Sequence, residues 1–365
     1  MTRVPVADVI VVGGGLAGLA TAFACSRRGL SVTVVDAGCP GAASLASAGV
    51  LGPSIGRGPK GGRVGRFMFA ARDRFPGYLD ELREQTGIAV PAVRGALEIA
   101  LNDTHLAELR ARAASLPDAR VLGAADVAAL EGALVPVAGA LHHPRDGAVD
   151  VPALRAALAA AARLSPRITV IQGVVMRVDL ARQAPNVTLG DGTGLGAAHL
   201  VVAAGAWVSQ LAGLPRPLPV RPVKGEIALA SGAPATRHVL FGAGGYLVPR
   251  NGVLLVGATS EEAGFDAEPT EAGAAALAST GRTLLRDWPG DAAFTAQQSG
   301  LRPMTPDGYP ILGRDPETPA LLYACGYSRN GVLASPLAAD CLAALIAGDD
   351  AGFDLTAFAA ARFGG

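Results

Sequence analysis

The stretch 9-VIVVGGGLAGLA-20 changes from β-branched residues to glycines and then to a helix-forming pattern of Ala and Leu. Gly13, Gly15 and Gly18 have the G-x-G-x-x-G spacing. In this pattern the first glycine permits a tight turn, the second lets a pyrophosphate approach the backbone, and the third lets a helix pack closely on a strand. The sequence therefore predicts a buried strand, a phosphate-binding turn and a helix.

An acidic residue ends the next predicted strand. We expect the first helix over 16–28, closed by Gly29, and the following strand over 31–36, with Asp36 at its end. A carboxylate at the end of the strand that follows the glycine motif suits the hydroxyl pair of a ribose. Phosphate would lie on the free N–H groups at the start of the helix. Because 48 of the 365 residues are glycine, the spacing alone is weak evidence. The order strand, turn, helix, strand and acid is what predicts nucleotide binding.

Composition excludes several classes of protein. Lys plus Arg and Asp plus Glu both number 31, so the charge gives no argument for nucleic acid as a partner. Residues 9–26 carry no charge, but three glycines in their middle argue against a membrane span or a signal peptide. Four cysteines without a C-x-x-C pair predict reduced thiols in a cytoplasmic protein: Cys25, Cys39, Cys325 and Cys341.

Small residues and hydroxyls dominate segment 37–50, which lets the backbone pass close to a bulky ligand. An ordinary flexible loop explains the same composition. A basic run follows, and we expect it to be a solvated loop before a helix over 75–86; its members are Arg57, Lys60, Arg63, Arg66, Arg72 and Arg74. A membrane surface or an acidic partner is the alternative.

The middle of the chain is rich in predicted strands. His142-His143-Pro144 has no third ligand at a suitable spacing, so we expect a loop and no metal site. Segment 199–207 predicts a buried strand that returns the chain to the first sheet. Asn251-Gly252 predicts a hairpin between 246–250 and 253–257. The remaining expected elements are strands at 89–101, 168–172, 174–178 and 225–230 and helices at 107–116, 124–130 and 154–164.

The C-terminal part repeats the strand–glycine–helix order. A strand over 321–324 precedes Gly326–Val332, and a helix is expected over 335–347. The helix N-terminus is available for a partial negative charge.

Taken together, these motifs resemble the D-amino-acid oxidase family of FAD enzymes, and most closely its glycine oxidase branch. The resemblance spans nearly the whole chain, and its order and spacing make it specific. The segments that carry it are 13–18 with Asp36, 201–207, 222–226, Tyr246 with 249–250, 300–303 with 307–308, and 326–331.

The resemblance implies an α/β fold with a Rossmann-like FAD-binding domain (GR2/DAO type) and a second α+β substrate domain that carries an antiparallel sheet. The implied FAD-binding domain is discontinuous, over 1–85, 145–220 and 300–365. The substrate domain would comprise 86–144 and 221–299. Some relatives tether the flavin through a cysteine in the stretch that matches 300–303, which has none here, so FAD is expected to be non-covalent.

The family also implies residue roles. Arg302 and Tyr246 match its carboxylate clamp and catalytic pair, and Val50, Gly244 and Arg329 would face the substrate. The implied cofactor-binding residues are Gly13, Gly14, Gly15, Leu16, Ala17, Gly18, Asp36, Ala37, Ala43, Ser44, Ser47, Ala48, Gly49, Val174, Val175, Ala204, Gly205, Trp207, Arg302, Tyr327, Ser328, Arg329, Asn330, Gly331 and Val332. Independently, an arginine fork binds a carboxylate through two parallel hydrogen bonds, and a tyrosine hydroxyl can cap one oxygen. The alternatives are a buried ion pair for Arg302 and a core aromatic for Tyr246.

The implied reaction is hydride transfer from Cα of an amino acid or N-substituted glycine to flavin N5. The imine then hydrolyses to glyoxylate plus amine or ammonia, and O2 is reduced to H2O2. Gly242–Gly245 leaves space beside Tyr246, and 260–262 lacks an expected methionine, which favours an N-alkylglycine over glycine. Four alternative functions stay open: a dehydrogenase with a quinone or protein acceptor, a glycine oxidase of thiamine biosynthesis, an NAD enzyme and a catalytically silent flavin-binding protein. A homo-oligomer is also possible.

Overall fold

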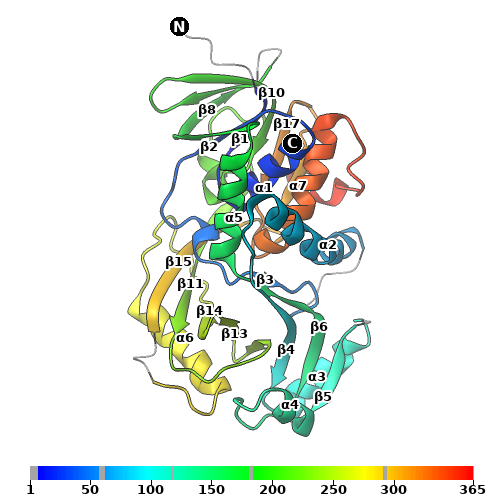
Figure 1. Cartoon of the computed structure of the whole chain (residues 1–365), viewed down its shortest axis with the longest axis vertical. Helices are drawn as coiled ribbons and strands as arrows, with labels where there is room; N and C mark the ends of the chain where they lie inside the picture. The colour runs from blue at the N-terminus through cyan, green and yellow to red at the C-terminus, as the bar shows by residue number, and fades with distance from the viewer. Residues whose placement is uncertain (1–6, 57–61, 117, 181–183, 291–293, 365) are drawn as a thin grey trace.

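Two sheets form the framework of an elongated molecule, one in each half of the view in Figure 1. The computed structural model describes residues 7–56, 62–116, 118–180, 184–290 and 294–364. Within these residues no helix is long and apolar enough to cross a membrane.

The first sheet is built around β1 (Ala7–Val12), which pairs in parallel with β2 (Val32–Asp36) and β10 (Gly194–Val202). The predicted return of the chain beside the first strand is therefore confirmed. The sheet order is β16-β17-β10-β1-β2-β7, with β7 (Ile168–Gln172), β16 (Ile311–Arg314) and β17 (Leu321–Cys325). The strands β8 (Val175–Asp179) and β9 (Asn186–Leu189) extend it through β10.

Helix α1 (Leu16–Arg27) packs against α5 (Val151–Leu164) and α7 (Gly331–Ala347), and α2 (Arg63–Thr86) contacts the latter two as well. These four helices lie together beside the first sheet (Figure 1). The approach of α1 to β1 depends on Gly18, because a Cβ atom there would lie 1.8 Å from the carbonyl oxygen of Gly13. The packing role predicted for the third glycine of the motif therefore has a direct steric basis.

The second sheet is mainly antiparallel and has the order β15-β11-β14-β13-β12-β4-β6-β3, with β5 paired to β6. The bounds are β3 (Val50–Leu51), β4 (Ala92–Ala100), β5 (Arg120–Gly123), β6 (Gly139–Val149), β11 (Arg221–Ala230), β12 (Val239–Gly242), β13 (Gly245–Arg250), β14 (Val253–Gly257) and β15 (Phe294–Met304). Three helices accompany it: α3 (Asp103–Ala113), α4 (Ala124–Leu130) and α6 (Glu271–Leu284). The hairpin predicted at Asn251-Gly252 is confirmed, with φ of 47° and 82° at its two turn residues.

Short 3-10 helices complete the chain. They are η1 (Ala43–Leu45), η2 (Gly205–Gln210), η4 (Thr356–Phe358) and η5 (Ala360–Phe363).

Two local predictions are wrong. His142-His143-Pro144 lies inside β6 rather than in a loop, where backbone pairing with β4 fixes it. The basic run is not a solvated loop, because α2 begins at Arg63; Pro76 inside this helix is a residue that normally ends helices, which explains the late predicted start. Arg57 and Lys60 lie outside the described residues.

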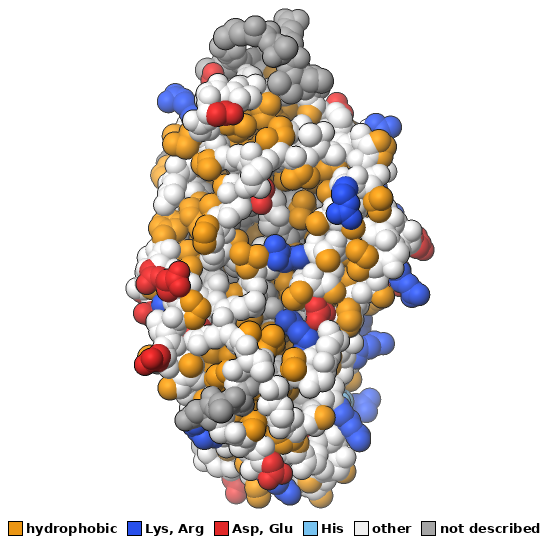
Figure 2. Space-filling view, turned by 60° about the vertical axis from the view of Figure 1, so that its left-hand side comes forward, with side chains coloured by type: hydrophobic (Ala, Val, Ile, Leu, Met, Phe, Trp, Pro, Cys, Tyr) orange, Lys and Arg blue, Asp and Glu red, His pale blue; other side chains and the backbone are white. Residues whose placement is uncertain are grey.

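Two arginines of α2, Arg72 and Arg74, form ion pairs with carboxylates of other elements or of α2 itself. Arg72 is buried and its Nη1 donates to Oδ1 of the buried Asp146 at 2.9 Å. Arg74 bonds to Glu81 and Asp340, both at 2.7 Å. On the face shown in Figure 2, acidic and basic side chains are interspersed.

We predict opposite effects for the same substitution at two helical glycines. Gly18→Ala should lower the free energy of unfolding by roughly 1–3 kcal/mol, because the added methyl overpacks the contact with Gly13. Gly77→Ala, on the exposed side of α2, should raise it by up to about 1 kcal/mol, because alanine favours the helix. Thermal midpoints of both variants measure this; a midpoint for Gly18→Ala at or above the wild-type value would contradict the steric argument.

Candidate active site

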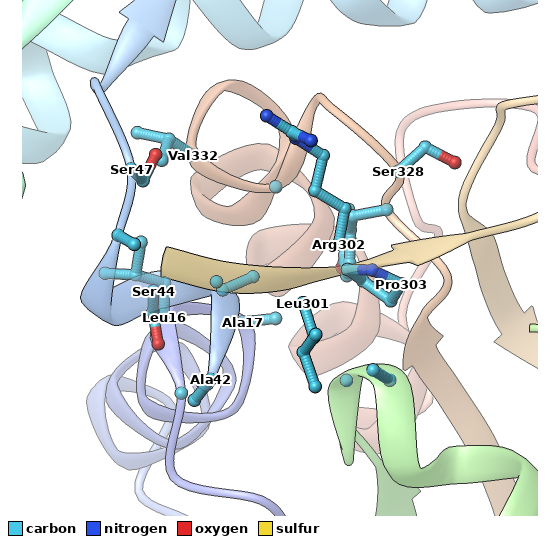
Figure 3. Close-up of a pocket in the computed structure, with 18 of the residues that line it drawn as sticks. Leu16, Ala17, Ala42, Ser44, Ser47, Leu301, Arg302, Pro303, Ser328 and Val332 are labelled. Atoms are coloured by element: carbon cyan, nitrogen blue, oxygen red, sulfur yellow. The ribbon is translucent and has the colours of Figure 1, made fainter. Parts of the chain in front are cut away.

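A cavity of about 890 Å³ lies where the first sheet faces the second. Its walls include the carboxyl ends of β1, β2, β10 and β17 and parts of β13 and β15. In open α/β sheets, ligands bind outside the carboxyl ends of the strands. Figure 3 shows β15 crossing this cavity, with Ala42, Ser44 and Ser47 on one side and Ser328 on the other.

One end of the cavity is suited to phosphate. Gly13, Gly15, Leu16 and Ala17 line it at the start of α1. Gly15 is the N-cap of α1, no side chain caps this end and its first turn has no acidic residue. The free N–H groups of a helix N-terminus attract anions. Ser44 lies across from this turn, with its Oγ 3.5 Å from the place of a Cβ at Gly15, so the hydroxyl faces the same space.

Asp36 lies beside the phosphate end, at the end of β2. Its Oδ1 accepts a hydrogen bond from the Gly14 N–H at 2.9 Å, and its carbonyl accepts one from Gly173 at 2.9 Å. Gly14 does not itself line the cavity, and neither does Gly18. Gly14 and Gly18, both predicted to bind the cofactor, therefore shape the turn without facing the cavity.

The other residues predicted to contact the cofactor or the substrate lie along the cavity wall. Beyond those already named, they are Ala37, Ala43, Ser47, Ala48, Gly49, Val50, Val174, Val175, Ala204, Gly205, Trp207, Gly244, Tyr246, Arg302, Tyr327, Ser328, Arg329, Asn330, Gly331 and Val332.

Arg302 projects from β15 into the cavity, away from the buried side of Leu301 (Figure 3). Its Nη1 donates to the carbonyl oxygens of Thr259 at 3.0 Å and Lys224 at 3.3 Å. The guanidinium lies over Gly225, where a Cβ would be 2.1 Å from its carbon and nitrogens. Backbone groups therefore fix the orientation of Arg302.

No acidic side chain in the described parts of the chain forms an ion pair with Arg302. Burial lowers the pKa of Arg302 from its ordinary value; Tyr246 opposes this shift, and the nearby charge of Arg329 adds to it. A half-buried cation without a counter-ion is unfavourable unless an anion binds it. The alternative of a buried ion pair therefore does not hold within the described residues.

Tyr246 lies on β13, opposite Gly257 of β14. Its ring lies over Gly257, where a Cβ would be 2.3 Å from the ring carbons. Burial raises the pKa of Tyr246, and the charges of Arg302 and Arg329 oppose the shift. The phenol therefore stays protonated near neutral pH and can donate a hydrogen bond. Tyr246 is half-buried; its ring packs against a core cluster of the second sheet and also lines the cavity.

Sequence reasoning missed the supports of this pair. Gly225 belongs to segment 222–226, which carries part of the family resemblance, but nothing in the sequence indicates that it lies beneath Arg302. Nothing in the sequence marks Gly257 or the carbonyl of Thr259, because both matter through contacts across strands.

The run Gly242–Gly245 does not simply leave space beside Tyr246, as the sequence suggested. It forms the turn between β12 and β13. A Cβ at Gly242 would lie 2.9 Å from Leu284, and one at Gly245 would lie 2.6 Å from the Gly257 carbonyl oxygen. Both glycines are therefore required by packing. Within the run, only Gly244 both lines the cavity and has open space around it.

Comparison with known proteins gives consistent matches over nearly the whole chain. The model of a family described as FAD dependent oxidoreductase (DAO) matches residues 8–345. Glycine oxidase of Geobacillus kaustophilus (strain HTA426) is 34% identical over 370 residues, 97% of each chain.

Solved structures agree with this match. The crystal structure of glycine oxidase from Geobacillus kaustophilus has a TM-score of 0.90 at 31% identity and covers 98% of both chains. Iminodiacetate oxidase (IdaA) from Chelativorans sp. BNC1 has a TM-score of 0.86 at 27% identity, covering 96% of this chain and 98% of its own.

We predict that Gly225→Ala weakens carboxylate binding without unfolding the protein. The three atoms nearest to the new methyl all belong to the flexible end of Arg302, so the guanidinium must move. The Kd of methoxyacetate for the cofactor-loaded protein should rise at least about tenfold, or about 1.4 kcal/mol. Gly194→Ala on β10, with no heavy atom near its Cβ position, is the matched control. Equal Kd values for the two variants would show that Arg302 does not bind the carboxylate.

Proposed function

The chain belongs to the family of FAD dependent oxidoreductases, and on this premise we propose that it oxidises the Cα–N bond of a glycine unit. The observation that carries the proposal is the unneutralised Arg302 beside Tyr246, in the same cavity as the uncapped glycine turn. Written as a balanced reaction, R-NH-CH2-COO⁻ + O2 + H2O gives R-NH2, glyoxylate and H2O2. The enzyme is FAD-dependent; the substrate and the use of O2 are parts of the proposal.

The described residues fit FAD. We assign the diphosphate to the turn of Gly13 and Gly15 with Ser44 and Ser47, and the adenosine ribose to Asp36, with Val174 and Val175 on the adenine side. The loop 327–332 would lie along the flavin ring. Bound FAD supplies a two-electron acceptor, and the chain supplies the binding and the orientation of both molecules.

We propose that FAD is held without a covalent bond. Segment 300–303 has no cysteine, and the two cysteines of the cavity wall are Cys39 and Cys325. Burial raises the pKa of Cys325 to about 12 and also raises that of Cys39. Since a thiolate is the reactive form of cysteine, both side chains are poor nucleophiles near neutral pH. All four cysteines are free, which suits a reducing cytoplasm.

The clamp defines which atom reacts. Two parallel hydrogen bonds from Arg302 and one from Tyr246 would fix the carboxylate and so the position of Cα. The substituent on nitrogen then extends toward the open side of the cavity at Gly244. Iminodiacetate, which the similar IdaA is named for, is itself an N-substituted glycine. We therefore propose an N-substituted glycine as substrate.

O2 is the proposed acceptor. A dehydrogenase would need a docking surface for its quinone or protein acceptor, and the basic run is the candidate for it. Two of its arginines, Arg72 and Arg74, instead pair with carboxylates of the same chain. We retain the proposed domain division, with the FAD-binding domain over 1–85, 145–220 and 300–365.

A substrate series coupled to peroxide detection tests the function. We expect kcat/KM to rise from glycine to sarcosine and further to N-ethylglycine, because each buried methylene can contribute about 0.8 kcal/mol. If glycine is the best substrate and activity falls with each added carbon, the proposal of an N-substituted glycine is wrong. If the reduced enzyme reacts with a quinone but not with O2, the oxidase proposal is wrong.

Arg302→Lys tests the clamp. Lysine keeps the charge but cannot form the bidentate pair, so kcat/KM should fall roughly 10- to 100-fold for the loss of one charge-assisted hydrogen bond of about 1.5–3 kcal/mol. Arg163→Lys on the exposed surface of α5 is the control. A change below about twofold in the Arg302 variant would remove Arg302 from the clamp.

A further inference from the structure

A short segment after β3, residues 52–56, forms part of the cavity wall. Gly52, Ile55 and Gly56 line the cavity. The half-buried Ile55 packs against the same apolar cluster as Tyr246. Gly52 lies beneath it, since a Cβ there would be 2.3 Å from Cδ1 of Ile55. The position of this segment therefore limits the space beside the clamp tyrosine.

Two hydrogen bonds to carboxylates hold the backbone of this wall segment. Sheet pairing ends with β3, and the segment itself belongs to no strand or helix. The Ser54 N–H donates to Oδ2 of Asp146 on β6 at 3.1 Å. The Gly56 N–H donates to Oε2 of Glu98 on β4 at 3.1 Å. The backbone is therefore held both before and after Ile55.

Both carboxylates are buried and have cationic partners. Asp146 accepts from Nη1 of Arg72 at 2.9 Å. Oε1 of Glu98 lies 2.7 Å from Nε2 of His143 and also accepts from Nη2 of Arg112. Burial opposes the ionisation of Glu98, but the hydrogen bonds from His143 and Arg112 outweigh it and lower its pKa from the ordinary value. Glu98 is therefore ionised near neutral pH, and a charged acceptor forms the stronger hydrogen bond.

Fold stability alone does not account for a carboxylate at position 98. Residues 95–100 of β4 are all buried, and Glu98 interrupts an otherwise apolar run. Replacing a buried ion pair by apolar residues of similar volume is often neutral or stabilising. Neither Glu98 nor Asp146 lines the cavity, so any effect of theirs on a ligand passes through segment 52–56.

We propose that Glu98 is a positioning residue for substrate selection: it fixes segment 52–56 so that Ile55 bounds the space that the substituent on the substrate nitrogen enters. Asp146 supports the same segment at Ser54. This inference rests on the proposed function, because it names a residue that sets how the same cavity selects its substrate. Glu98 takes no part in the chemical step.

Hydrogen–deuterium exchange of the cofactor-loaded protein tests the positioning directly. Glu98→Gln keeps the shape of the side chain but replaces the charged acceptor by a neutral amide, so exchange of the Gly56 N–H should become at least about tenfold faster. Asp315→Asn is the matched control, because Asp315 is also buried, pairs with an arginine and accepts backbone N–H groups. It should leave exchange in segment 52–56 unchanged. Unchanged exchange of Gly56 in Glu98→Gln would overturn the inference.

Kinetics with two substrates test the selection. Glu98→Gln should lower the ratio of kcat/KM for N-ethylglycine to that for glycine at least about threefold. The change should lie mainly in the KM of N-ethylglycine, because a loosened wall makes fewer contacts with the substituent. Asp315→Asn should keep the wild-type ratio even where its thermal midpoint falls as far. A ratio that follows the thermal midpoint in both variants would show that Glu98 contributes stability only.

A double-mutant cycle with Ile55→Ala shows whether Glu98 acts through this side chain. The ratio should fall in Ile55→Ala, and adding Glu98→Gln should lower it by less than about 1.5-fold more, because the positioned side chain is gone. A second fall as large as in the wild-type background would overturn the inference. Thermal midpoints show which variants are folded. Glu98→Asp, which keeps the charge but withdraws the carboxylate by one methylene, replaces Glu98→Gln if the latter is unfolded, with the same expected fall.

The outcomes also separate this inference from the proposed function. If N-alkylglycines yield H2O2 while exchange and ratio stay unchanged in Glu98→Gln, only the role of Glu98 is wrong. If no glycine derivative is oxidised, the proposed function fails. Binding of two ethers that cannot be oxidised as amines then still decides the role of Glu98. In Glu98→Gln the Kd of ethoxyacetate, followed by the visible absorbance of the flavin, should rise at least about threefold relative to that of methoxyacetate, and an unchanged ratio of the two Kd values would overturn the inference.

Discussion

Backbone pairing of β15 is the interaction on which the arrangement of the cavity depends. This strand pairs with β11 from Arg221 to Ala230 in the second sheet. Near its end the Leu301 N–H donates to the carbonyl of Gly41 at 2.8 Å, and the Pro303 carbonyl accepts from Ser328 at 2.9 Å. A single strand therefore joins the loop beside the phosphate end, the loop before α7 and the antiparallel sheet. Arg302 lies between these attachment points, so its position follows from all three.

A buried polar network behind the clamp strengthens this arrangement. Glu226, which is fully buried, accepts hydrogen bonds from the N–H and Oγ1 of Thr270 and from Gln297. Its own N–H donates to Oγ1 of Thr259, the residue whose carbonyl accepts from Arg302. A buried carboxylate with several partners holds a specific geometry, since each lost partner leaves a costly unsatisfied group. The orientation of Arg302 is thus supported through two successive layers of hydrogen bonds.

The sequence predicted the local parts of this structure better than the contacts between them. The glycine turn, the strand ending at Asp36 and the Asn251-Gly252 hairpin each depend on neighbours in the chain, and each was predicted. The full length of α2 was not, because Pro76 is unfavourable in a helix and only tertiary packing of residues such as Phe67 explains its tolerance. The candidate clamp came from a family resemblance. Its backbone supports come from strands distant in sequence, and no local pattern encodes them.

The turn between β12 and β13 limits how this cavity can change during evolution. Gly244 has open space around it, so a larger residue there would touch no core side chain. Its φ of 76° is nevertheless a conformation that few residues other than glycine, asparagine and aspartate adopt. The backbone therefore excludes bulky apolar residues before selection acts on the side chain. At the turn between β12 and β13, substrate preference would therefore diverge through polar and charged residues. The fold itself restricts which relatives of this enzyme can arise by single substitutions.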